Sequence, residues 1–195
     1  MIRNIWAVGR NYSEHAKELG NPVPREPLFF LKAGSCITRA QTIKLPAWTK
    51  EVHHEIELAF QFGPNLKLSK IGLALDLTER QTQSRLKEKQ APWTLAKSFI
   101  DSCPLSELVT IPENFDLNTI AFQLSINHQT RQKGNSQQMI FPIAHLVDFA
   151  IHHFPVCEND ILLTGTPPGV GPLSPGDQLH ASIDGLIEWS LEVTA

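Results

Sequence analysis

The sequence predicts a strand-based fold with short helices, and three observations lead to this prediction. The chain contains 14 Pro and 11 Gly, a turn-rich composition that favours strands joined by loops over a helical bundle. Its apolar residues form short runs, such as Leu28–Lys32 and Gly72–Leu75. Other segments alternate between apolar and polar residues, as in Ala121–Asn127. Because the chain has 195 residues and shows no internal repeat and no linker-like tract, we expect a single domain over residues 1–195.

Composition excludes several classes of function. A net charge of -3 gives no electrostatic reason to expect binding to nucleic acid. Cys36, Cys103 and Cys157 are too widely spaced for a disulfide framework or a CxxC zinc site, so we expect a reducing, cytoplasmic environment. The first residues lack the apolar core of a signal peptide, and no apolar run approaches the roughly 20 residues that span a bilayer.

The N-terminal segment predicts a strand followed by a short helix. Ile2–Val8 is the predicted strand, residues 11–13 offer helix caps, and the helix would end near Gly20. His15 and Glu18 lie three residues apart on this helix and would face the same side. A carboxylate can orient an imidazole and raise its basicity, as a general base requires. The ordinary alternative is an exposed ion pair.

The next segments predict a buried strand over Leu28–Lys32 and a strand that contains His53–Leu58. If side chains alternate along this second strand, Glu55 and Glu57 share one face. Two adjacent carboxylates repel one another, so one must be protonated, bridged by a cation or exposed to water. Magnesium and calcium relieve such repulsion because both prefer oxygen ligands. A half-exposed strand with a polar outer face is the alternative.

A second apolar strand, Gly72–Leu75, ends directly before Asp76. A helix is predicted over Glu79–Lys89, and either Asp76 or Thr78 could cap its first turn. Asp76 is therefore a further carboxylate at the end of a strand, and helix capping is its ordinary structural role.

Three further polar residues are candidates for binding an anionic group because of their neighbours in the sequence. Arg80 and Gln83 are i,i+3 partners near the start of the predicted helix, where an Arg can bind a carboxylate through two hydrogen bonds. Lys97 lies among apolar residues, and a partly buried Lys needs an anionic partner or a lowered pKa. An exposed Arg and a Lys that extends its ammonium to solvent are the alternatives.

The C-terminal half predicts strands around one longer helix. A helix is expected over Met139–Phe154, a buried strand over Asp160–Thr164, and a closing hairpin around Asp184 and Gly185. The Gly- and Pro-rich segment at residues 165–171 lacks the Gly-Lys-Ser/Thr ending of a phosphate loop. Its backbone and the Thr166 hydroxyl could line a pocket, or the segment could be a plain turn.

Five segments, taken in order, resemble the fumarylacetoacetate hydrolase family, and specifically its short branch of acylpyruvate hydrolases and oxaloacetate decarboxylases or tautomerases. These segments are Val8–Tyr12 with His15 and Glu18, His54–Leu58, Asp76–Gln83, Pro92–Phe99 and Thr164–Gly171. The resemblance covers nearly the whole chain. It implies an α+β fold, a mixed β-roll with short peripheral helices, in a protein that is usually a homodimer.

The resemblance also implies a role for each candidate site residue. Glu55, Glu57 and Asp76 would bind Mg²⁺ or Mn²⁺, with Ca²⁺ as a possible substitute. His15 and Glu18 would form a dyad that activates water. Lys97 would bind and polarise the substrate. Arg80, Gln83 and Thr166 would hold the pyruvoyl end of the substrate.

The implied function is metal-dependent hydrolysis of a carbon–carbon bond in an acylpyruvate, which yields pyruvate and a carboxylate through a stabilised enolate. The alternatives are oxaloacetate decarboxylation and enol–keto tautomerisation at the same site, or a noncatalytic ligand-binding domain. The expected partner is a small 2-oxo acid, without nucleic acid or membrane. The short Phe62–Ile71 connection, Gln81 and Ile100 depart from the family pattern and bear on the choice of substrate.

Overall fold

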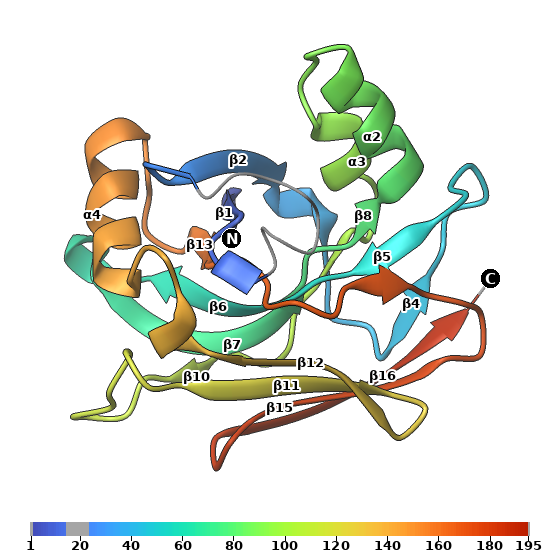
Figure 1. The fold of residues 1–195 in the computed structure, drawn as a ribbon. Helices are drawn as coiled ribbons and strands as arrows, with labels where there is room; N and C mark the ends of the chain where they lie inside the picture. The colour runs from blue at the N-terminus through green and yellow to red at the C-terminus, as the bar shows by residue number, and fades with distance from the viewer. Residues whose placement is uncertain (1, 15–23, 195) are drawn as a thin grey trace.

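A computed structural model describes residues 2–14 and 24–194 of the chain (Figure 1). These residues form two large mixed sheets with a few short helices at the periphery, which confirms the predicted α+β fold class. None of the helices within the described ranges is long and apolar enough to cross a membrane.

The first sheet has six strands in the order β10-β7-β6-β13-β1-β2. Their bounds are β1 (Asn4–Gly9), β2 (Leu28–Ala33), β6 (Ile56–Phe62), β7 (Leu68–Leu75), β10 (Val109–Thr110) and β13 (Ile161–Leu163). β1 and β13 are parallel, whereas the β6–β7 and β6–β13 pairs are antiparallel. The central strands β6 and β13 are buried on both faces, which explains their nearly continuous apolar sequences.

The second sheet has five strands in the order β12-β11-β15-β16-β4. Their bounds are β4 (Thr42–Lys44), β11 (Ala121–Ile126), β12 (Gln129–Asn135), β15 (Gln178–Ile183) and β16 (Ile187–Thr194). Every second residue of β11 is buried, as its alternating sequence predicts. Asn127 and His128 join β11 to β12 with φ angles of 51° and 64°, so both adopt the left-handed conformation of a two-residue hairpin turn.

The main hydrophobic core is built from apolar side chains of both sheets, and β11 and β15 contact β6 and β7 directly. Figure 1 shows the second sheet lying beneath the first. Fully buried members from the two sheets include Phe60, Phe62, Ile71, Leu73, Phe122 and Leu124. Burying a side chain of this size stabilises a fold by about 1.5–3 kcal/mol, so this core holds the two sheets together.

Short elements complete the fold. The small sheets contain β5 (Val52–His54), β8 (Thr78–Glu79) and β14 (Gly171–Pro172), and β3 (Ile37–Thr38) with β9 (Cys103–Pro104). The α-helices are α2 (Arg80–Glu88), α3 (Thr94–Lys97) and α4 (Ile143–His153), and the 3-10 turns are Gly34–Cys36, Pro64–Leu66 and Ser136–Gln138. In Figure 1, α2 and α3 lie together at one end of the first sheet, and α4 lies on its opposite flank.

The prediction that Leu28–Lys32 is a buried strand is wrong about its side chains. β2 exists, but it is the edge strand of its sheet, and Leu31 is 48% exposed. The only fully buried side chain of this segment is the charged one, Lys32, at 0% exposure. An edge strand is covered on fewer sides than a central one, so apolar composition did not ensure burial here.

Two predicted helix starts also differ from the structure. The cap of α2 is Glu79, whose side chain accepts a hydrogen bond from the Thr82 backbone N–H at 2.6 Å, because β8 keeps the preceding residues extended. α4 begins at Ile143 rather than Met139, after Pro142 at its N-cap. The predicted helix that carries His15 and Glu18 lies outside the described residues beyond its first two positions.

One buried carboxylate joins the N-terminal strand to β13. Asp160 accepts hydrogen bonds from the Trp6 indole N–H at 2.9 Å and from the Cys157 backbone N–H at 3.1 Å. It also accepts two hydrogen bonds from Asn4, one from the backbone and one from the side chain. Because β1 and β13 both lead towards the site described below, this cluster fixes two strands on which the site depends.

Replacing this carboxylate should therefore destabilise the fold. We expect Asp160→Ala to lower the free energy of unfolding by about 3 kcal/mol, because several buried N–H groups lose their acceptor. Urea unfolding followed by far-UV circular dichroism measures the change. The control is Glu158→Ala at an exposed position nearby, with an expected change within about 0.5 kcal/mol. Equal effects of the two substitutions would contradict the role of Asp160.

Candidate active site

Three carboxylates meet where β6 and β7 pair. Ile56 lies opposite Leu75 in this antiparallel pair, so the next residues at this end of the pair are Glu55 and Asp76. The Asp76 backbone N–H donates to the Glu55 carbonyl oxygen at 2.9 Å, which fixes this register. Glu57 lies two residues farther along the chain, within β6. The strand pairing therefore brings together carboxylates that are about twenty residues apart in the sequence.

These carboxylates are close enough to share a cation. One ligand oxygen from each of Glu55, Glu57 and Asp76 lies within 4.8 Å of the other two. The three residues are 5%, 1% and 1% exposed, respectively. Three buried carboxylates at this separation repel strongly unless positive charge compensates them. The prediction that these residues converge is confirmed, and the half-exposed polar face is excluded.

Three basic side chains compensate part of this charge. The Lys97 ammonium forms an ion pair with Glu55 at 2.7 Å and another with Asp76. Lys32, from β2, contacts the other Asp76 oxygen at 2.7 Å and donates to the Lys97 carbonyl oxygen. Arg80 donates to the other Glu55 oxygen at 2.6 Å. Of the alternatives that the sequence left open for Lys97, the structure shows burial with anionic partners.

Burial and charge shift the pKa values of the central groups in a consistent direction. Burial raises the pKa of Glu57 well above its usual range, and repulsion from Asp76 and Glu55 adds to this effect. The Gly165 backbone N–H, which donates to Glu57 at 2.7 Å, opposes the shift. For Lys97, burial lowers the pKa, but Asp76 and Glu55 together raise it above its usual value. Lys97 is therefore a stable ammonium, whereas Glu57 holds its negative charge only when further positive charge is nearby.

One face of α2 contributes to the same pocket. Arg80, Gln83 and Lys87 lie at i, i+3 and i+7, a spacing that aligns side chains along a helix. Arg80 donates from Nη1 to the Gln83 side-chain oxygen at 2.7 Å and from Nε to His53 Nδ1 at 3.3 Å. Arg80 also donates from Nη2 to Glu55. Together these bonds leave one N–H on each Nη atom, and the Gln83 amide N–H₂ group, for a ligand.

The opposite wall comes from residues that follow β1 and β13. Because these two strands are parallel, their C-terminal ends lie at the same edge of the sheet. Arg10 follows β1, and Thr166 follows β13. The Thr166 hydroxyl donates to the Ile56 carbonyl oxygen at 2.8 Å and accepts from Gln132 at 2.8 Å. Its proton is thus committed to the scaffold, and any hydroxyl contact with a ligand would use its remaining acceptor capacity.

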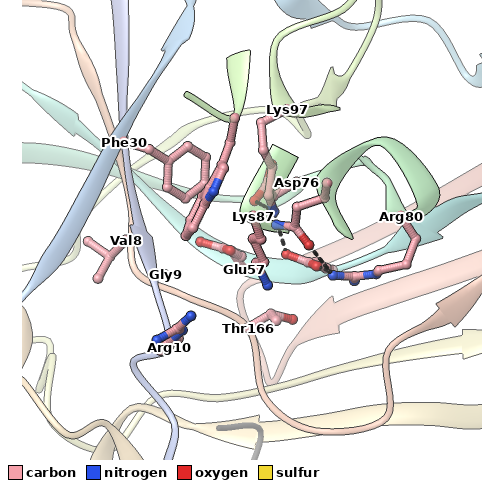
Figure 2. A pocket seen from close by; sticks show the side chains of 13 residues that line it. Val8, Gly9, Arg10, Phe30, Glu57, Asp76, Arg80, Lys87, Lys97 and Thr166 are labelled. Carbon is pink, nitrogen blue, oxygen red and sulfur yellow. Dashed lines mark hydrogen bonds and ion pairs between the residues drawn. The ribbon is translucent and has the colours of Figure 1, made fainter. Parts of the chain in front are cut away.

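Together these elements form a pocket of about 410 Å³, its open mouth included. Its charged and polar lining residues are Arg10, Glu55, Glu57, Asp76, Arg80, Gln83, Lys87, Lys97 and Thr166, and Val8, Gly9, Phe30 and Trp93 complete the wall. Figure 2 shows Glu57 and Asp76 in this pocket, with the side chains of Arg80 and Lys97 directed into the same region. A pocket with this lining suits a small polar anion rather than a large apolar ligand.

Seven of the nine predicted site residues therefore lie in one pocket: Glu55, Glu57, Asp76, Arg80, Gln83, Lys97 and Thr166. Their roles towards a ligand remain predictions. The other two, His15 and Glu18, lie outside the described residues.

Sequence reasoning missed three cations of the site. Lys32 was assigned to an ordinary apolar strand, and Lys87 to an ordinary helix. Arg10 was part of a family motif but received no role. The lone Lys in the apolar run 28–33 is the signal that could have identified Lys32, because a charge among residues expected to be buried needs a partner. Lys87 could have been found by extending the Arg80–Gln83 helical face by one more turn.

Comparison with known proteins agrees with this geometry. Residues 4–194 match the family described as fumarylacetoacetate (FAA) hydrolase C-terminal. The chain is 42% identical to the mitochondrial oxaloacetate decarboxylase of Dictyostelium discoideum, over 94% of this chain and 90% of that protein. It is 37% identical to the human mitochondrial oxaloacetate tautomerase FAHD1, over 98% of this chain and 91% of that protein.

Solved structures give the same relationship. A fumarylpyruvate hydrolase from Pseudomonas aeruginosa, in complex with Mn²⁺ and pyruvate, superposes with a TM-score of 0.91. It is 30% identical, and the match covers 99% of this chain and 90% of that chain. The shared fold and the sequence identity over almost the full length confirm the resemblance found in the motifs. The chain belongs to the fumarylacetoacetate hydrolase family, an enzyme family with metal-dependent members.

Proposed function

We propose that this protein is a divalent-metal-dependent enzyme that acts on oxaloacetate, interconverting its enol and keto forms, with decarboxylation as a secondary reaction of the same site. The main observation behind this proposal is the convergence of Glu55, Glu57 and Asp76 in a pocket where the other charged side chains of the described residues are cationic. The names of the relatives favour oxaloacetate chemistry over the acylpyruvate hydrolysis that we placed first from the sequence.

The acidic residues fit a hard divalent cation. All three offer carboxylate oxygens, the ligand type that Mg²⁺ and Mn²⁺ prefer, and no sulfur or imidazole ligand is needed. The raised pKa of Glu57 supports the same assignment, because an unpaired buried carboxylate favours its neutral form until a cation binds. Glu55, Glu57 and Asp76 would hold Mg²⁺, with Mn²⁺ as an alternative. When bound, the ion supplies positive charge for the electron density that develops on a 2-oxo acid as it enolises.

Arg80 and Gln83 would bind the carboxylate next to the keto group. Arg80 is held by Glu55, Gln83 and His53, and its two remaining Nη–H groups can donate to a carboxylate. Gln83 accepts from Arg80 through its side-chain oxygen, so its amide N–H₂ is free to donate in the same direction. Thr166 would contact this end of the substrate as part of the pocket wall.

Lys97 would stabilise negative charge on the substrate oxygen that gains it. Its raised pKa keeps Nζ protonated at neutral pH, so it acts as a hydrogen-bond donor rather than as a base. Glu55 and Asp76 fix the position of its ammonium, and Lys32 donates a hydrogen bond to the Lys97 carbonyl oxygen. A protonated amine held in this manner polarises a neighbouring carbonyl without moving during the reaction.

His15 and Glu18 would carry out the proton transfer. The proposed base is an imidazole nitrogen of His15, which takes a proton from the third carbon of the substrate, with Glu18 orienting the ring. A second proton is delivered to the oxygen on the second carbon, and this completes the change from the keto to the enol form. These two assignments depend on the family motif.

Acylpyruvate hydrolysis is the second candidate. A specific observation favours it: the fumarylpyruvate hydrolase of Pseudomonas aeruginosa has the same fold at 30% identity. The same enolate would then leave after His15 activates a water molecule for attack on the distal carbonyl. A homodimer and a cytoplasmic location stay predictions, and the oxaloacetate-acting relatives cited above are described as mitochondrial.

A direct assay of three reactions tests the proposed function. With Mg²⁺, we expect rapid loss of the ultraviolet absorbance of enol-oxaloacetate, slower formation of pyruvate and CO₂, and weak hydrolysis of acetylpyruvate and fumarylpyruvate. Chelation by EDTA should abolish all turnover, because the acidic site loses its cation. Absence of metal-dependent turnover of any 2-oxo acid would refute the proposal, and hydrolysis as the fastest reaction would select the second candidate.

Glu57→Gln tests the metal site by a measurement that does not depend on activity. A carboxyl whose folded-state pKa is raised contributes stability below its unfolded pKa, and this contribution is lost as pH rises through the folded pKa. In EDTA at pH 8 we expect Glu57→Gln to raise the free energy of unfolding by at least about 1 kcal/mol, since each pKa unit is worth about 1.4 kcal/mol. At pH 4 the gain should vanish.

The same variant should lose the stabilisation that Mg²⁺ gives to the wild-type protein, as read from the thermal unfolding midpoint. Glu51→Gln, at a partly exposed carboxylate outside the pocket, is the matched control and should keep the Mg²⁺ response. Equal stability of Glu57→Gln and wild type in EDTA at pH 8, or a preserved Mg²⁺ response, would contradict the assignment of Glu57.

His15→Ala tests the proton-transfer dyad. We expect the tautomerisation rate to fall by about 100-fold or more, the usual size of a general acid–base contribution. Acylpyruvate hydrolysis should fall by a similar factor, whereas decarboxylation, which needs no water attack, should fall less. His145→Ala, at an exposed position on α4, is the control and should leave all three rates unchanged. Equal losses in hydrolysis and decarboxylation would refute the role of His15 in activating water.

A further inference from the structure

We propose that Arg10 and Lys87 form a second anion-binding subsite in the pocket, which holds the distal carboxylate of a four-carbon dicarboxylic 2-oxo acid. This inference rests on the proposed function and extends it, because it specifies how the end of the substrate remote from the metal is recognised. It also bears on which reaction of oxaloacetate the site favours.

Lys87 lies in the pocket, and no carboxylate of the described residues pairs with it. It extends from the last turn of α2 on the same face as Arg80 and Gln83, and it is half-buried. Its ammonium lies 5.5 Å from the centre of the Trp93 ring, and within the described ranges it forms no ion pair. Burial lowers the pKa of Lys87, and repulsion from Arg10 and Arg80 lowers it further. An anion bound beside the Lys87 ammonium would offset the cost of burying its charge and its repulsion from the two arginines.

Arg10 has an unusual backbone conformation and, among the described residues, no hydrogen-bond acceptor. Its φ angle of 59° lies in the left-handed region, which a side chain larger than that of Gly adopts at an energetic cost. Across the described part of the chain, no group accepts a hydrogen bond from its guanidinium. Figure 2 shows this guanidinium at the pocket wall near Thr166, with the Lys87 ammonium directed into the same space. A strained residue that presents an unpaired cation to a pocket is typical of a binding site.

Among the described residues, no carboxylate of the pocket forms an ion pair with either cation. Glu55 is bound by Arg80 and Lys97, Asp76 is bound by Lys97 and Lys32, and Glu57 accepts from the Gly165 backbone N–H. A divalent metal at the triad would add further positive charge. A ligand with one carboxylate at the metal and a second at Arg10 and Lys87 neutralises both ends. The ordinary alternative, in which Lys87 only covers Trp93, leaves the position of Arg10 unexplained.

Such a subsite would favour tautomerisation over decarboxylation. Decarboxylation breaks the bond between the third and fourth carbons, its electron pair forms the enolate, and the fourth carbon leaves as neutral CO₂. Cations that bind the distal carboxylate stabilise the charge that this reaction must remove, so they raise its barrier. Tautomerisation moves a proton from the third carbon and returns one to the keto oxygen, and the distal carboxylate stays charged throughout. The subsite then binds ground state and transition state equally.

Equilibrium binding tests the subsite without turnover. Lactate and malate are matched 2-hydroxy acids that differ by the distal carboxylate, and without an oxidant neither reacts. Calorimetry on the Mg²⁺-loaded protein should show malate binding at least about tenfold more tightly than lactate, the usual worth of a charge-assisted hydrogen bond. In Arg10→Gln and Lys87→Gln, malate should bind about tenfold more weakly, and lactate should change by less than about twofold. Lys89→Gln, at the exposed end of α2, is the control and should match the wild type.

Product analysis tests the consequence for the reaction. With oxaloacetate, the double variant Arg10→Gln/Lys87→Gln should show a raised KM and a several-fold higher ratio of CO₂ release to enol–keto exchange. An equal loss of lactate and malate binding, or an unchanged ratio, would overturn the subsite even if wild-type turnover of oxaloacetate is normal. Conversely, tight and charge-dependent malate binding by a protein that does not turn over oxaloacetate would support the subsite and refute the proposed function.

Discussion

The pairing of β6 with β7 is the constraint on which the rest of the site depends. It places Glu55 beside Asp76 and buries both, together with Glu57, beneath a pocket. Such a concentration of carboxylates is unfavourable unless cations accompany it, so the surrounding elements must supply them. β2 supplies Lys32, α2 supplies Arg80, and α3 ends at Lys97. The helices α2 and α3 and the edge strand β2 therefore belong to one electrostatic arrangement.

The surrounding cations fall into two groups with different consequences. Lys32 and Lys97 form ion pairs inside the protein, where their main effect is to hold the carboxylates in place without a ligand. Arg10 and Lys87 have no such partners in the part of the chain that the structure describes, and they line the open pocket. Positive charge without an internal partner is available to an incoming anion and can steer it towards the site. In the proposed function, the first group of cations would support the metal site and the second would select the substrate.

Sequence patterns were reliable where one local rule governs the structure. The alternation in β11 and the hairpin turn at Asn127 both follow from residue type and spacing. They were unreliable where the answer depends on what lies next to a segment. β2 has the composition of a buried strand, but it lies at the edge of its sheet. Asp76 has the residue type and position of a helix cap, but its carboxylate is bound by two lysines instead.

The sequence by itself determined the fold class, the family and the identity of the candidate metal ligands, because ordered motifs and acidic residues at strand ends can be recognised without coordinates. Only the tertiary structure decided which cations meet those ligands. Lys32 reaches Asp76 across 44 positions of sequence, and Arg10 reaches the pocket because β1 runs parallel to β13. Strand order and register fix these encounters, and neither is encoded in the local spacing of residues along the chain.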